Sequence, residues 1–102
     1  MPLKVYIVGA VTGLDPEEVR AKFMSAEERL KRMGFVPVNP VNHVEEGTGW
    51  VEAMKICIPL LVSCDAVFKL PDYEYSKGSL LELTIARNLE MNEFIDSHIK
   101  QR

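Results

Sequence analysis

The run LKVYIV at residues 3–8 is apolar at all but one position, and Gly9 follows it directly. An almost unbroken apolar run that ends in glycine is typical of a strand covered on both faces, as in a parallel sheet. Shorter runs at residues 35–38 and 66–70 have the same character. These three segments predict a parallel sheet with the first run in its interior.

A helical segment follows the first strand. Asp15 is suited to cap its start, Pro16 to the first helical position, and Glu18 to completing a capping box. Gly34 is well placed to end the helix. Between these ends a single apolar stripe recurs at helical spacing, formed by Val19, Phe23, Ala26, Leu30 and Met33.

Two further helical segments complete the pattern. Residues 50–63 have helical character, but Pro59 removes a backbone donor and clashes with the preceding turn, so we expect a kink or a restart there. Residues 78–90 predict the last helix and residues 91–95 a short final strand. The remainder is expected to be a frayed helical tail.

Strands alternate with helices along the whole chain, which implies parallel strands joined by right-handed crossovers. The length of 102 residues suits one domain over residues 1–102. Pro37 cannot donate to a ladder, which assigns its strand to a sheet edge. We therefore predict an α/β fold with a parallel sheet of four to five strands in the order 2-1-3-4.

Ligands of such sheets bind beyond the carboxyl ends of the strands, at the point where the strand order reverses. That point lies between the first and third strands of the predicted order. The loops at residues 9–13, 39–42 and 71–78 are expected to meet there. Functional residues should be sought in these loops.

The segment SKGSLLE at residues 76–82 is the strongest local signal. Its serine and glycine at a helix start can present backbone N–H groups to an anion. Glu82 lies about one turn further on, where the helix dipole favours a carboxylate that stays ionised near neutral pH and can act as a nucleophile. The same letters from Ser79 to Glu82 also fit a capping box, and spacing alone favours that interpretation.

Other candidates have two interpretations each. Gly9 and Gly13 either make a tight turn or let a sugar or phosphate approach the backbone. Tyr6 belongs to the core or turns its hydroxyl to a pocket. Turn formation is sufficient to explain Asp65. Trp50 is more typical of a core or interface anchor than of a platform for a base.

Composition excludes several classes of function. A net charge of −3 argues against general nucleic-acid binding, and no apolar run is long enough to cross a bilayer. The N-terminus has no signal-peptide pattern, so a cytoplasmic location is expected. Cys57 and Cys64 lack metal or redox spacing, and His43 and His98 are isolated, so neither a metal nor an organic cofactor is expected.

Four segments together resemble the nucleoside 2-deoxyribosyltransferase-like superfamily: KVYIVGAVTG at 4–13, NP at 39–40, SCDAVFKLP at 63–71 and SKGSLLELTIA at 76–86. The similarity covers nearly the whole chain in order. It extends to a branch of small bacterial and phage proteins related to 2′-deoxynucleoside 5′-monophosphate N-glycosidases. The resemblance implies a flavodoxin-like or Rossmann-like three-layer sandwich.

The resemblance also implies chemistry at the N-glycosidic bond of a 2′-deoxynucleoside or its 5′-monophosphate. In that superfamily the motif glutamate attacks C1′ of the sugar, and Glu82 occupies its position. Ser76, six residues earlier, matches the branch in which a serine contacts the 5′-phosphate. The implied substrate-binding residues are Tyr6, Gly9, Thr12, Gly13, Asn39, Asp65, Ser76 and Gly78.

One departure concerns the position eight residues before Asp65, where relatives commonly carry a catalytic aspartate and this chain has Cys57. A thiol is a poor substitute for a carboxylate. Three alternatives follow: an enzyme with weak or altered activity, a non-catalytic nucleotide- or metabolite-binding module, and a structural domain with a vestigial pocket.

The expected partners are a small nucleoside or nucleotide and further copies of the chain, with no nucleic acid and no membrane. Relatives often form dimers or larger oligomers. Apolar residues on the segment at 50–63, among them Val51 and Ile58, fit a homo-oligomer as well.

Overall fold

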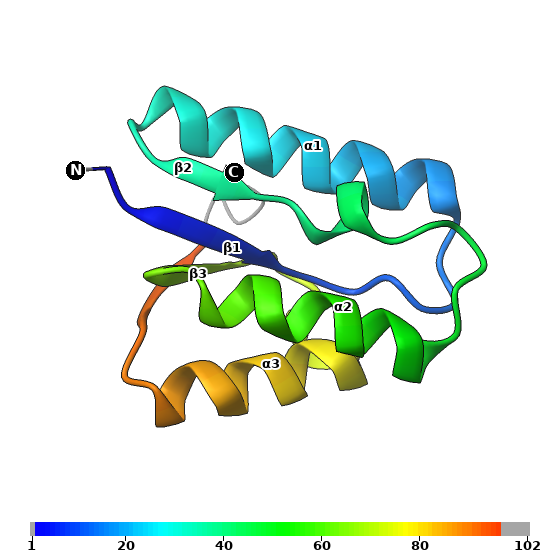
Figure 1. Ribbon diagram of the computed structural model, residues 1–102. Helices are drawn as coiled ribbons and strands as arrows, with labels where there is room; N and C mark the ends of the chain where they lie inside the picture. Colours follow the sequence, from blue (N-terminus) through cyan, green and yellow to red (C-terminus); the bar gives the residue numbers. More distant parts are fainter. Residues whose placement is uncertain (1, 97–102) are drawn as a thin grey trace.

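The computed structural model describes residues 2–96, and the predicted helical tail falls outside this range except for Asp96 (Figure 1). Strands and helices alternate as the sequence predicts. The strands are β1 (Lys4–Val8), β2 (Val36–Val38), β3 (Ala66–Lys69) and β4 (Asn92–Ile95), and the α-helices are α1 (Pro16–Arg32), α2 (Trp50–Val62) and α3 (Lys77–Asn88). Two short 3₁₀ turns, η1 (Pro40–His43) and η2 (Tyr73–Tyr75), lie in loops.

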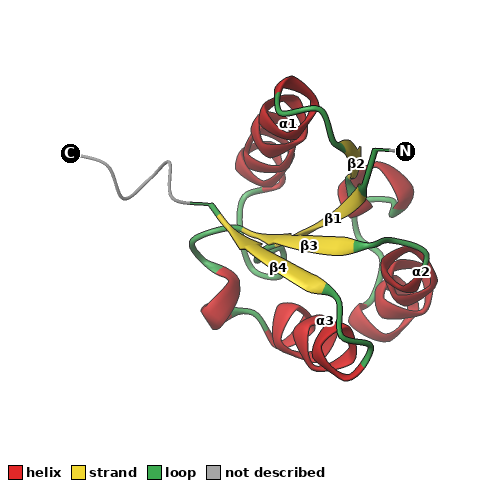
Figure 2. Ribbon diagram, turned by 90° about the vertical axis from the view of Figure 1, so that its left-hand side faces the viewer, coloured by secondary structure: helices red, strands yellow, loops and turns green. Residues whose placement is uncertain are grey.

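The four strands form one parallel sheet in the order β2-β1-β3-β4. Helix α1 covers one face, and α2 and α3 cover the other, which gives three layers (Figure 2). The predicted α/β class, flavodoxin-like sandwich and strand order are therefore confirmed. Pro37 lies in the edge strand β2, where a missing backbone donor is tolerated.

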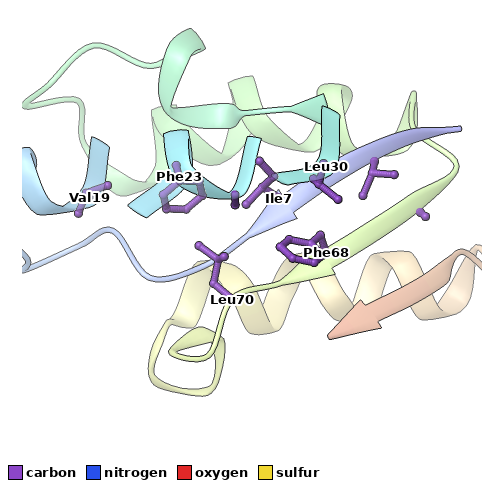
Figure 3. Close-up of a cluster of buried hydrophobic side chains, with 9 residues drawn as sticks. Ile7, Val19, Phe23, Leu30, Phe68 and Leu70 are labelled. Atoms are coloured by element: carbon purple, nitrogen blue, oxygen red, sulfur yellow. The ribbon is translucent and has the colours of Figure 1, made fainter. Parts of the chain in front are cut away.

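The residues of β1 alternate between the two faces of the sheet because successive side chains on a strand point in opposite directions. Val5 and Ile7 pack towards α1, in a cluster made entirely of apolar side chains (Figure 3). Tyr6 and Val8 pack towards α2 and α3. Burial of a large apolar side chain stabilises a fold by about 1.5 to 3 kcal/mol, so β1 contributes to both cores.

The ends of α1 agree only partly with the sequence prediction. Asp15 is the N-cap residue, but its side chain makes no capping hydrogen bond, so the predicted capping box with Glu18 is not formed. Pro16 fixes the first helical position, and the backbone carbonyl of Asp15 accepts the first helical hydrogen bond. At the other end Gly34, with φ of +91°, terminates the helix in the left-handed conformation as predicted.

Helix α2 runs as a single element from Trp50 to Val62 with Pro59 inside it, so the predicted restart does not occur. Leu61, beyond the proline, is fully buried, and this packing holds the last turn despite the lost hydrogen bond. Among residues 2–96, no helix combines the length and the apolar character that a membrane crossing requires.

Candidate functional site

A cavity of about 540 Å³ lies where the loops that follow β1, β2 and β3 meet. Each of the three loops predicted to converge contributes to its wall, and the amino-terminal halves of α2 and α3 complete it. This is the carboxyl edge of the sheet at the switch in strand order, where the three loops were predicted to meet.

Glu82 lies in the wall of this cavity, on α3, and only 6% of its surface is exposed. Its Oε2 accepts a hydrogen bond of 2.6 Å from the hydroxyl of Tyr6. The N-cap of α3 is Ser76, whose Oγ accepts a hydrogen bond from the Ser79 amide at 3.1 Å. Ser79 is therefore already inside the helix, and the capping box from Ser79 to Glu82 is not formed.

Tyr6 connects the sheet to the cavity. Its ring is fully buried between the sheet and the two helices, while the residue also lines the cavity. Cys57 of α2 packs in the same buried cluster as Tyr6 and also lines the cavity. The cavity wall therefore brings a carboxylate, a phenol and a thiol together, and the phenol donates a hydrogen bond to the carboxylate.

Burial controls the charge of these three side chains. Removal from water raises the pKa of Glu82 to about 7, against the opposing effect of the hydrogen bond from Tyr6. Burial also raises the pKa of the Cys57 thiol and, still more, that of the Tyr6 hydroxyl. The helix dipole was expected to keep Glu82 ionised, but desolvation outweighs it. Near neutral pH, Glu82 alone of the three changes its charge.

The glycine-rich loop after β1 forms one side of the cavity, with Gly9, Thr12 and Gly13 in its wall. A Cβ at Gly9 would lie 2.6 Å from Leu70 Cδ1, so any larger residue here would force the buried Leu70 side chain to shift. Gly13 has φ of +82°, a conformation that glycine adopts without strain. The glycines of this loop therefore serve its tight turn, and they also lie in the cavity wall, where a ligand could approach the backbone.

Trp50, at the start of α2, and the start of α3 form the opposite side. A Cβ at Gly78 would lie 3.2 Å from Met54 Sδ and 3.3 Å from Trp50 Nε1, so the glycine permits close packing of the two helices. The ammonium group of Lys77 lies 4.2 Å from the centre of the Trp50 ring. This cation–π contact fixes the tryptophan beside the cavity.

Two predicted site residues lie outside the cavity wall. Asn39 is buried, and it accepts a hydrogen bond from the Val41 amide and donates one to Glu27, each at 3.0 Å. Asp65 precedes β3, at the opposite end of the strand, and its Oδ2 accepts a hydrogen bond of 2.9 Å from the Lys4 amide. Their contacts stabilise the η1 turn and the start of the sheet.

Sequence reasoning did not single out several residues of the wall. Ser79 was interpreted only as a helix cap, and Met54 only as part of a helix. Arg20 lies at the cavity, where it pairs with Glu17 at 2.9 Å and with Glu46 at 3.8 Å. No local sequence pattern marks these positions, because they converge only through the packing of α1, α2 and α3.

Within residues 2–96, no three histidine, cysteine, aspartate or glutamate side chains are grouped so that they could hold a metal ion. The chemical resources of the wall are the buried Glu82 carboxylate, the carboxylates of Glu45 and Glu46, the Arg20 guanidinium, a phenol, a thiol, hydroxyl groups and backbone amides.

The molecule is an α/β sandwich with a buried, hydrogen-bonded carboxylate beside a cavity at the carboxyl edge of its sheet. The chain belongs to the family described as Domain of unknown function (DUF4406), whose model matches residues 3–94. This range includes all residues of the cavity wall. A search of curated proteins found no match.

Proposed function

We propose that the protein cleaves the N-glycosidic bond of a 2′-deoxynucleoside or its 5′-monophosphate, or transfers the deoxyribosyl group to another base, with Glu82 as the nucleophile. The observation that carries this proposal is the Glu82 carboxylate, which lines the cavity and is not used to cap its helix. A carboxylate that faces an oxocarbenium-like carbon is what retaining glycosidic chemistry requires. The resemblance of SKGSLLE to the superfamily motif supports the choice of bond.

In the first step a carboxylate oxygen of Glu82 forms a bond to C1′ of the sugar. The C1′–N bond breaks, its electron pair stays on the base nitrogen, and the base leaves with a proton from solvent or a nearby acid. In the second step water or another base attacks C1′ and displaces the carboxylate. Hydrolysis and transfer differ only in this second nucleophile.

The contact with Tyr6 supports both steps. Its hydroxyl donates to Oε2 of Glu82, which leaves Oε1 as the oxygen available for attack. The same hydrogen bond favours the ionised form of the carboxylate and lowers its pKa. It also stabilises the carboxylate as a leaving group when the covalent intermediate breaks down.

The cavity has the size and composition expected for this substrate class. Its volume of about 540 Å³ falls within the roughly 300 to 1,000 Å³ typical of small-molecule sites. The first amides of α3 and the glycine-rich loop offer backbone donors for a sugar or its phosphate. Arg20 is the basic side chain of the described cavity wall, and its partners Glu17 and Glu46 reduce its effect on a phosphate.

The test is to incubate the full chain with each 2′-deoxynucleoside and each 5′-monophosphate and to follow free base by chromatography. Loss of the nucleophile in Glu82→Gln should reduce base release or exchange by about 10³-fold or more. Glu28→Gln, which alters an exposed glutamate on α1, is the matched control and should retain activity. No base release from any substrate, or release that Glu82→Gln does not change, would contradict the proposal.

A second candidate is a binding module for the same ligands without catalysis. Cys57 favours it, because burial raises the pKa of its thiol and keeps it neutral where relatives have a carboxylate. Ligand-dependent thermal stabilisation that is equal in the wild type and Glu82→Gln, without base release in either, would establish this alternative.

A further inference from the structure

The hydroxyl group of Ser79 stands out among the polar groups of the cavity wall. Only 1% of the residue is exposed, and its Oγ has no hydrogen-bond partner among residues 2–96. Ser79 lines the same cavity as Glu82. A buried hydroxyl without a partner is costly, because it has lost water and gained nothing in return.

Two other hydroxyls, one on α3 and one at the end of α2, donate to the backbone carbonyl of a preceding turn. Thr84, on the same helix as Ser79, donates to the carbonyl of Leu80 at 3.0 Å, and Ser63 donates to the carbonyl of Leu60 at 2.7 Å. Both are exposed and could have used water instead. Ser79 is far more buried but makes no such bond, so its hydroxyl has no partner among the described residues that would compensate for its burial.

The position of Ser79 specifies what that partner presents. It lies three residues before Glu82, hence on the same face of α3 and roughly 4.5 Å from it along the helix axis. Helical side chains lean towards the amino terminus, so the Glu82 carboxylate lies over the turn that contains Ser79. A ligand carbon in contact with the carboxylate would bring its neighbouring substituents close to Ser79, whose hydroxyl is covered in the ligand-free protein and would meet them by rotation of the side chain.

We infer that Ser79 binds the pentose, with its hydroxyl hydrogen-bonded to a hydroxyl group of the sugar that Glu82 attacks. This inference rests on the proposed function, since it takes the sugar to be the group beside the carboxylate. A serine hydroxyl both donates and accepts, as a sugar hydroxyl does, and the pair can satisfy each other in a site without water. Ser79 would therefore select the sugar, while the rest of the cavity accommodates the base.

The experiment measures binding separately from turnover. In the Glu82→Gln background, calorimetry gives the Kd of the four 2′-deoxynucleosides and of matched ribonucleosides, 2′,3′-dideoxynucleosides and 2′,5′-dideoxynucleosides. Adding Ser79→Ala should weaken 2′-deoxynucleoside binding by about fivefold to tenfold, the effect of one hydrogen bond. The analogue that lacks the contacted hydroxyl should bind equally with and without Ser79→Ala, which identifies that hydroxyl.

A second readout needs no ligand. Ser79→Ala removes the unpaired hydroxyl, so the melting temperature of the free protein should rise while nucleoside binding falls. Ser25→Ala, an exposed serine on α1, is the matched control for binding. The opposite signs of the two effects distinguish a ligand contact from a structural role.

The outcomes separate this inference from the proposed function. If nucleosides bind and Ser79→Ala leaves every Kd ratio unchanged, the inference is wrong and the proposed function stands. If they bind with the expected hydroxyl dependence but no base is released, Ser79 binds the sugar and catalysis is excluded. If no nucleoside or nucleotide binds, both are contradicted.

Discussion

The two faces of the sheet differ in what they bury. The face under α1 packs against a cluster that is entirely apolar: Val5, Ile7, Val19, Phe23, Ala26, Leu30, Ala66, Phe68 and Leu70. The face under α2 and α3 buries Tyr6 and Cys57 in its cluster and holds Glu82 and Ser79 beside it. One strand, β1, supplies both kinds of side chain by alternation. The buried groups of the candidate site thus lie on the face with α2 and α3, although Ile7, Val19 and Phe23 of the α1 cluster also line the cavity.

This difference between the faces has a thermodynamic consequence. Burial of an apolar core stabilises the folded state at every pH, whereas burial of a carboxylate destabilises the folded state once the carboxylate ionises. The face with α2 and α3 therefore contains groups that reduce stability at neutral pH, which is common where function rather than packing determines a residue. Substitutions on the two faces should differ in sign and in pH dependence.

The largest effect is expected on the α1 face. Leu30→Ala removes a fully buried side chain and should lower the free energy of unfolding by about 2 to 5 kcal/mol, equally at pH 5 and pH 8. Urea denaturation measures it. Met24→Ala, which truncates an exposed side chain of the same helix, should change the value by less than about 0.5 kcal/mol. A loss below about 1 kcal/mol for Leu30→Ala would contradict the assignment of the main core.

Glu82→Gln should act with the opposite sign. The folded pKa of Glu82 is raised from 4.5 to about 7, so the wild type loses stability as pH rises between these values. At pH 8 the substitution should stabilise the protein by about 3 kcal/mol, and at pH 5 by less than about 1 kcal/mol. Tyr6 and Cys57 have raised pKa values and add no ionisation in this range.

Urea denaturation at the two pH values measures this difference, with Glu28→Gln as the control. An equal effect of Glu82→Gln at pH 5 and pH 8 would mean that the carboxylate is not buried in its charged form.

The contrast between the faces also explains what could be read from the sequence. Helical stripes follow directly from periodicity, so the α1 core was predictable except for Met33, which is exposed. The strand order was predictable because Pro37 marks an edge strand. Glu82 was found through its motif, but spacing alone favoured a capping box. Its true partner, Tyr6, is 76 residues away in sequence. The contact forms only when β1 and α3 pack together, so no local sequence pattern predicts it.

The same limit applies to the predicted site residues that lie outside the cavity wall and to the predicted restart of α2. Asn39 and Asp65 were selected by position in a motif, and their side chains instead make local structural hydrogen bonds. The continuity of α2 through Pro59 reflects tertiary packing that overrides a local propensity.

Tyr6→Phe tests the hydrogen bond between Tyr6 on β1 and Glu82 on α3. Loss of the hydroxyl removes the hydrogen bond that lowers the pKa of Glu82, so this pKa should rise. The nucleophile must be ionised, and the pH at which base release reaches half its maximum should therefore move to higher values. At pH 7 the rate should fall by about tenfold or more, as for a hydrogen bond to a charged group.

The pH–rate profile of base release measures this shift. Tyr73→Phe, which alters a half-buried tyrosine outside the cavity wall, is the control and should leave the profile unchanged. A lower rate in Tyr6→Phe with the same pH midpoint would show that the hydroxyl orients the carboxylate without tuning its charge.

The smallest effect on stability is expected at Ser76, where helix capping and phosphate binding can be separated. Ser76 caps α3 through its hydrogen bond with the Ser79 amide. Aspartate caps helices as well as serine does, so Ser76→Asp should change stability by no more than a few tenths of a kcal/mol, whereas Ser76→Ala should cost about 1 kcal/mol.

The added carboxylate of Ser76→Asp would repel a 5′-phosphate at the start of α3 but leave an uncharged nucleoside unaffected. If the phosphate binds there, Ser76→Asp should reduce the kcat/KM for 5′-monophosphates by about tenfold or more relative to nucleosides, since like-charge contact is worth at least about 1.4 kcal/mol at short range. An unchanged ratio would mean that Ser76 serves the helix alone and that the phosphate, if the substrate carries one, lies elsewhere along the cavity wall.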